Sequence, residues 1–136
     1  MWIPLDDVPR DTTLEFISGS HKWDKFYRPQ RFDGSALNED DGLEAIPDIE
    51  AHRGDYEILG WAVLPGDAIA FDYRTIHGAP ANNNKSNHRR AFSLRLVGDD
   101  THFVRREGIV TSPPFPGVKL NHGDRLAGDE FPILLT

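Results

Sequence analysis

The sequence contains no cysteine, which excludes disulfides, thiolate zinc sites and cysteine-ligated iron–sulfur clusters. It has no apolar run near the roughly 20 residues that a transmembrane helix needs. Residues 1–7 show neither the basic segment nor the apolar segment of a secretory signal peptide. We therefore expect a cytoplasmic protein that does not use a membrane as a partner.

Basic residues are in the minority. The sequence has 15 lysines and arginines and 22 aspartates and glutamates, which gives a net charge of −7. This sign argues against nucleic acid or an anionic membrane as the main partner. The chain has 136 residues, of which 38% are hydrophobic, enough for one core. We predict a single domain over residues 1–136.

Helical spacing of apolar residues is also missing, because ten prolines and twelve glycines divide the chain into short segments. Several of these segments alternate between apolar and polar residues, as half-buried strands do. We predict strands at residues 2–5, 12–17, 58–64, 68–73 and 91–97. Short strands joined by Gly/Pro turns predict an all-β sandwich, jelly roll or barrel.

Two regions do not resemble strands. Residues 24–53, about a fifth of the chain, are polar with an acidic centre and predict a long surface excursion. The tail from Ser112 is rich in proline and predicts an extended, irregular segment. The chain also opens directly on a predicted strand, which would leave a sheet edge uncovered. We expect that edge to be closed, either by self-association or by the tail of the chain.

His77 and Arg89 are the candidate functional residues. His77 ends one alternating segment, and Arg89 precedes the next, on the face of Ala91 and Ser93. Imidazole suits Fe(II), and a guanidinium fork suits a carboxylate. The alternative interpretation is a surface histidine in a hairpin and a solvated basic pair at the start of a strand.

Four segments, taken in order, resemble the C-terminal part of the phytanoyl-CoA dioxygenase family. They are Met1-Trp-Ile-Pro-Leu-Asp-Asp-Val8, Leu14-Glu-Phe-Ile-Ser-Gly-Ser-His-Lys22, Gly66-Asp67 through His77-Gly-Ala79, and Arg89-Arg-Ala-Phe-Ser-Leu-Arg95 with Gly98-Asp-Asp100. The second segment is similar to the family's Pro-Gly-Ser-His turn, with Ser18 in the place of proline. The segment Thr111-Ser-Pro-Pro-Phe-Pro-Gly117 is like the tail of bacterial members.

The resemblance implies a double-stranded β-helix (jelly roll, cupin-like) that lacks its first strands and N-terminal helices. It also implies an Fe(II)/2-oxoglutarate-dependent dioxygenase that hydroxylates a small organic substrate. Residue by residue, His77 matches the distal iron ligand and Arg89 matches the arginine that binds the far carboxylate of 2-oxoglutarate. Trp2 matches a tryptophan that lines the cosubstrate pocket.

The family's His-x-Asp motif lies upstream of the strand that starts here at Met1, and the sequence has no equivalent there. One such motif, His122-Gly-Asp124, follows His77 instead, and we interpret it as a surface turn. His21 is expected to support its turn. We assign no carboxylate partner to His52, His88 or His102, and we do not place Asp72 beside His77.

Three functions therefore stay open. The first is the dioxygenase itself or a truncated form of it. The second is a non-catalytic β-roll binding module, or pseudo-enzyme, that keeps Arg89 but holds no metal. The third is an assembly protein, a homo-oligomer that pairs through its exposed N-terminal sheet edge.

Overall fold

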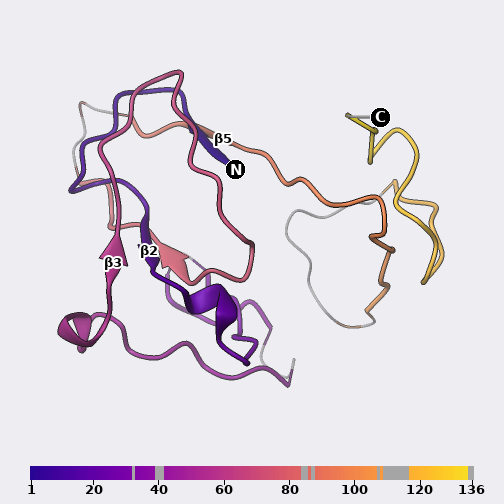
Figure 1. Ribbon diagram of the computed structural model, residues 1–136, viewed down its shortest axis with the longest axis horizontal. Helices are drawn as coiled ribbons and strands as arrows, with labels where there is room; N and C mark the ends of the chain where they lie inside the picture. Colours follow the sequence, from indigo (N-terminus) through magenta and orange to yellow (C-terminus); the bar gives the residue numbers. More distant parts are fainter. Residues whose placement is uncertain are drawn as a thin grey trace. The chain divides into compact units, whose positions relative to one another are not determined.

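The computed structural model describes residues 1–31, 33–38, 42–83, 86, 88–106, 108 and 117–134 (Figure 1). Within these residues the chain is mostly β structure and irregular segments, and its only helices are two short 3-10 turns. No helix in the described ranges is long and apolar enough to cross a bilayer. The all-β prediction is confirmed at this level.

In the described part of the chain, five short strands form two antiparallel sheets. The elements are β1 (Trp2–Pro4), β2 (Glu15–Ile17), η1 (Ser20–Lys22), η2 (Arg53–Asp55), β3 (Ile58–Leu59), β4 (His77–Gly78) and β5 (Ala91–Ser93). One sheet pairs β1 with β5, and the other has the order β3-β2-β4. Figure 1 shows β3 beside β2, although the two strands are distant in the sequence.

The first strand is paired on both sides. Its register places Trp2 opposite Ser93 and Ile3 opposite Phe92 in β5. On the other side Trp2 exchanges two backbone hydrogen bonds with Ile69, at N–O distances of 2.8 and 2.9 Å. The backbone of residue 2 is therefore part of a ladder and not an open edge.

Four of the five predicted strands exist, and each is shorter than predicted. Residues 12–17 form only β2, and residues 58–64 form β3 and, further on, an isolated bridge between Val63 and Val8. Residues 68–73 form no extended strand and pair only at Ile69. Their alternation is visible in burial as far as Asp72, because Ile69 and Phe71 are half-buried while Ala68, Ala70 and Asp72 are exposed. It ends at Tyr73, which the pattern places on the face of Ile69 but which is 82% exposed.

The apolar core of the described chain is small. Its fully buried hydrophobic side chains are Val8, Phe16, Ile17 and Val63. Phe16 and Ile17 are neighbours in β2, the central strand of its sheet, so the core lies around that strand. β4, which carries His77, pairs directly with β2 and is thereby attached to the core.

By its internal contacts the chain divides into two compact units. Unit 1 contains Met1–Tyr27 and Glu44–Leu96, and unit 2 contains Arg28–Leu43 and Val97–Thr136. All the strands described above lie in unit 1. The single domain predicted over residues 1–136 stays a prediction.

The predicted excursion and tail fall partly in unit 2. Residues 28–43 of the excursion belong to this unit, and a bridge joins Gln30 to Ala36. Further along, His102 forms a bridge with Arg125. Residues 32, 39–41 and 109–116 lie outside the described residues, so the structure does not test residues 39–41 of the excursion's acidic centre or most of the proline-rich start of the tail.

Candidate functional site

His77 is the first residue of β4 and is held at its backbone by β2. It lies opposite Phe16 in the antiparallel pair. Its ring packs against two aromatic rings, with centroid distances of 4.8 Å to Phe71 and 5.9 Å to Phe16. The residue is otherwise exposed. The strand therefore fixes the ring on an aromatic support and leaves part of it open to solvent.

The tautomer of His77 follows from one hydrogen bond. Its Nδ1 lies 2.8 Å from the carbonyl oxygen of Thr75. Since a carbonyl oxygen can only accept, Nδ1 carries the proton in this bond. In the neutral ring the lone pair is then on Nε2. A histidine that donates through one nitrogen to a carbonyl is already arranged to bind a metal through the other.

Arg89 is half-buried and spans two loops of unit 1. Its Nη1 donates to the carbonyl oxygens of Thr12, at 2.6 Å, and Pro80, at 2.8 Å. Thr12 lies shortly before β2, and Pro80 lies shortly after β4. One edge of the guanidinium therefore ties together the loops beside the strand that carries His77. Among the described residues nothing accepts from its Nε or Nη2.

Arg89 lines a small pocket. The cavity has a volume of about 160 Å³, and its lining residues are Asp7, Val8, Pro9, Asp11, Thr12, Asn82, His88 and Arg89. Ligand sites for drug-sized molecules typically measure about 300–1,000 Å³. This pocket can therefore admit one end of a small molecule, such as a carboxylate group, but not a large substrate.

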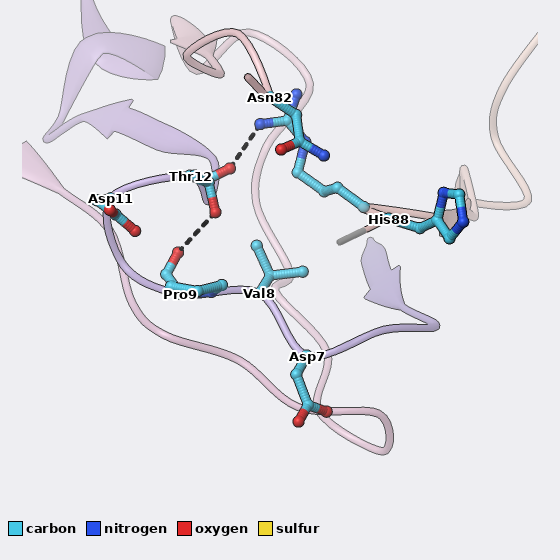
Figure 2. Close-up of a pocket in the computed structure, with 8 residues that line it drawn as sticks. Asp7, Val8, Pro9, Asp11, Thr12, Asn82 and His88 are labelled. Carbon is cyan, nitrogen blue, oxygen red and sulfur yellow. Dashed lines mark hydrogen bonds between the residues drawn. The ribbon is translucent and has the colours of Figure 1, made fainter. Parts of the chain in front are cut away.

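Figure 2 shows the hydrogen bonds of Thr12, one of the residues that line this pocket. The hydroxyl of Thr12 donates to the carbonyl of Pro9, and the carbonyl of Thr12 accepts from Arg89. The two carboxylates of the lining, Asp7 and Asp11, lie on different sides of the pocket (Figure 2). They oppose the binding of an anion, whereas the guanidinium favours it.

The sequence predicted that His77 and Arg89 share one cavity. In the structure each has its own contacts, and His77 is not among the residues that line the pocket at Arg89. The groups that accept hydrogen bonds from Arg89 are backbone carbonyls, whereas the sequence suggested a carboxylate as its partner. A cavity common to both side chains stays a prediction.

Trp2 lies in the other sheet and is half-buried. Directly paired residues in an antiparallel ladder place their side chains on the same face. The register therefore puts Trp2 on the face of Ser93, and Pro4 on that of Ala91. This is the face on which strand alternation predicts Arg89, although Trp2 does not line the pocket at Arg89.

The His-x-Asp motif at residues 122–124 has contacts typical of a turn. His122 and Asp124 are exposed, and the Asp124 carboxylate accepts from the backbone N–H of Asn121 at 2.7 Å. This agrees with the interpretation as a surface turn. In the part of the chain that the structure describes, no group of three histidine, aspartate or glutamate side chains could hold a metal ion.

The turn before η1 explains the departure at Ser18. The N–H of Ser18 donates to the carbonyl of Glu57 at 2.9 Å, a bond that proline cannot make. Gly19 follows with a φ of 72°, a conformation that favours glycine. The buried Ser20 comes next, and sequence reasoning placed it in the turn without assigning it a role.

Comparison with known protein families shows to which family the chain belongs. The family model described as phytanoyl-CoA dioxygenase (PhyH) matches residues 1–91, which is 91 of the 136 residues. The chain belongs to the phytanoyl-CoA dioxygenase family. Searches of curated proteins and of solved structures gave no significant match. The region matched by the phytanoyl-CoA dioxygenase model includes Trp2, His77 and Arg89, and it indicates a dioxygenase-like function.

Proposed function

We propose that this chain is part of an Fe(II)/2-oxoglutarate-dependent dioxygenase that hydroxylates a small organic substrate. The observation that carries the proposal is the family match, because it spans all three candidate residues. We further propose that the two small sheets are sections of a double-stranded β-helix. Bound Fe(II) and 2-oxoglutarate would supply the oxidising chemistry, with succinate and carbon dioxide as products of the cosubstrate.

Arg89 fits the cosubstrate in this proposal. Its Nη1 is occupied by two carbonyls, which hold the guanidinium in place. Its Nε and Nη2, to which the described residues offer no acceptor, form the second edge of the planar fork, the geometry that binds a carboxylate through two parallel hydrogen bonds. Arg89 would thus anchor the far carboxylate of 2-oxoglutarate. Trp2 would form an apolar wall of the same site.

Of the ligands that an Fe(II) site needs, we can assign only one among the described residues, His77. The Nε2 atom of His77 carries the lone pair that a metal needs, and its ring is supported by Phe16 and Phe71. A facial Fe(II) site takes two histidines and one carboxylate, and the described residues hold no group of three such ligands. We therefore assign His77 as a ligand and derive no step through the metal.

The test measures 2-oxoglutarate binding by saturation-transfer NMR on the full chain. We expect Arg89→Ala to abolish binding and Arg89→Lys to weaken it, because lysine keeps the charge but loses the fork. The control is Arg95→Ala, which removes an exposed arginine and should leave binding unchanged. Asp11→Asn should strengthen binding, since it removes a negative charge from the pocket lining.

The same samples separate the functions. Succinate formation from 2-oxoglutarate with Fe(II) and oxygen, lost in Arg89→Ala, supports the dioxygenase. Binding without succinate formation favours the non-catalytic binding module only where Fe(II) is shown to bind the same sample, because a chain that holds no iron would form no succinate in either case. Equal binding by the wild type and Arg89→Ala would contradict the role of Arg89 in either.

A further inference from the structure

The peptide group between Thr75 and Ile76 makes a hydrogen bond on each side. Its carbonyl oxygen accepts from Nδ1 of His77 at 2.8 Å. Its N–H, which belongs to Ile76, donates to the hydroxyl oxygen of Ser20 at 2.9 Å. Because a trans peptide is planar, its N–H and C=O point in opposite directions. The orientation of the N–H therefore determines where the carbonyl points.

Ser20 is in a position to fix this orientation. Its side chain is buried, with a relative exposure of 4% for the residue. Its hydroxyl donates to the carbonyl of Ile17 at 2.8 Å, so its oxygen is left to accept from Ile76. The hydroxyl proton is thus used in the hydrogen bond to Ile17, the last residue of β2. Ile17 in turn donates from its N–H to the carbonyl of Ile76 at 2.9 Å, which holds the next peptide group as well.

A turn over residues 72–75 supports the same peptide from the other end. The N–H of Thr75 donates to the carbonyl of Asp72, and the N–H of Arg74 donates to its carboxylate, both at 2.9 Å. The guanidinium of Arg74 adds two bonds to this carboxylate, each 3.2 Å long. An aspartate at the first position of a turn with these bonds is a stable local structure.

We propose that Ser20 is a positioning residue that sets the tautomer of His77. The hydrogen bonds run from the Ile17 carbonyl through the Ser20 hydroxyl and the 75–76 peptide to Nδ1 of His77. Toward its neighbour, each of these groups acts only as a donor or only as an acceptor. Nδ1 therefore keeps its proton, and the lone pair of the neutral ring is on Nε2. The proposal rests on the proposed function only in that it takes His77 as the metal ligand.

The test reads the tautomer directly, without metal or cosubstrate. Long-range ¹H–¹⁵N correlation spectra of the full chain, at a pH where the ring is neutral, distinguish a protonated Nδ1 from a protonated Nε2. We expect the Nδ1–H form in the wild type. Ser20→Ala should shift His77 toward the Nε2–H form that free histidine prefers, while His122, an exposed histidine in another turn, should not change.

Three further variants guard against a general loss of structure. Ser20→Thr keeps the hydroxyl and should restore the Nδ1–H form. Asp72→Ala weakens the turn without touching the buried serine and should shift the tautomer partly, whereas Asp72→Asn keeps the acceptor for Arg74 N–H and should not. A folded Ser20→Ala or Asp72→Ala protein that keeps the wild-type tautomer would overturn the proposal. Since none of these spectra involves Arg89 or 2-oxoglutarate, that failure would leave the proposed function standing.

Discussion

Arg90 holds Asp6 through both its main chain and its side chain. The N–H of Arg90 lies 2.7 Å from Oδ2 of Asp6, and its Nη2 lies 2.6 Å from Oδ1. These hydrogen bonds lower the pKa of Asp6 from its usual 3.8 to about 2. Asp6 follows β1 and Arg90 precedes β5, so the pair closes one end of the sheet that these strands form.

Acid should weaken this closure. A carboxylate whose pKa is lower in the folded than in the unfolded state stabilises the fold above the unfolded value, and that contribution disappears as the pH falls through the folded value. For Asp6 the loss should run from about pH 4 down to about pH 2. We expect Asp6→Asn to be less stable than the wild type at neutral pH and to lose less stability over this acid range.

The measurement is urea denaturation at a series of pH values. The control is Asp7→Asn, since Asp7 forms no ion pair with the described residues. Identical pH profiles for the wild type and Asp6→Asn would show that the ion pair contributes nothing.

Thr13 offers a stability test in the core. It is fully buried, and its hydroxyl oxygen has no hydrogen-bond partner among the described residues. A buried polar atom without a partner costs about 1–3 kcal/mol. Thr13→Val replaces the hydroxyl with a methyl group of similar size, so we expect the free energy of unfolding to rise by about 1 kcal/mol.

Chemical denaturation at neutral pH tests this expectation. Thr12→Val is the matched control, because the Thr12 hydroxyl does donate to a carbonyl, that of Pro9. That variant should gain no stability. A destabilised Thr13→Val protein would mean that its hydroxyl is satisfied by a bound water molecule.

Metal binding by this chain should be weak. His77 is the one ligand that the family resemblance assigns, and a stable Fe(II) site needs two histidines and a carboxylate. We expect anaerobic titration with Fe(II) or Mn(II) to show no saturable one-to-one binding at micromolar concentration. Tight binding that survives His122→Ala would show that the ligands lie elsewhere in the chain.

Self-association is the expectation for the N-terminal sheet. Trp2 is paired on both sides, but one face of this sheet is apolar and open: Phe92 is 55% exposed and Leu5 is also 55% exposed. Ile3 lies opposite Phe92 on that face. We propose that two copies associate through this sheet, so that sedimentation at micromolar concentration gives a dimer and Phe92→Ser gives a monomer. A monomeric wild type under the same conditions would contradict this.

Strand alternation predicted the position of β5, where Phe92 and Leu94 alternate with Ala91 and Ser93, whereas β1 was predicted from a short apolar run that ends at Asp6. Alternation failed for residues 68–73, whose pattern is equally regular, because a pattern records which side chains are buried and not which backbone groups find a partner. Only Ile69 in that segment meets another strand. The length of a strand is decided by its neighbours, which local sequence does not contain.

The candidate site was likewise predictable only in part, for its side chains but not for their backbone partners. The family motifs identified His77 and Arg89, but the acceptors of Arg89 are the backbone carbonyls of Thr12 and Pro80. Every residue has a carbonyl, so no residue type marks these positions in the sequence. The role of Ser20 was missed for a related reason, since its partner Ile76 contributes only a backbone N–H. The aspartate that opens the turn at residue 72 was a usable signal.

The pairing of β1 with β5 has a consequence for the order of folding. Residue 2 is hydrogen-bonded in a ladder with the segment around residue 93, and its other partner is Ile69. Contacts between residues so distant in the sequence are slow to form, because the long intervening loop must close first. During synthesis β1 leaves the ribosome well before Ile69 and β5, so neither pairing can form until those residues have emerged. Chaperone dependence should therefore be greatest for nascent chains that end before β5.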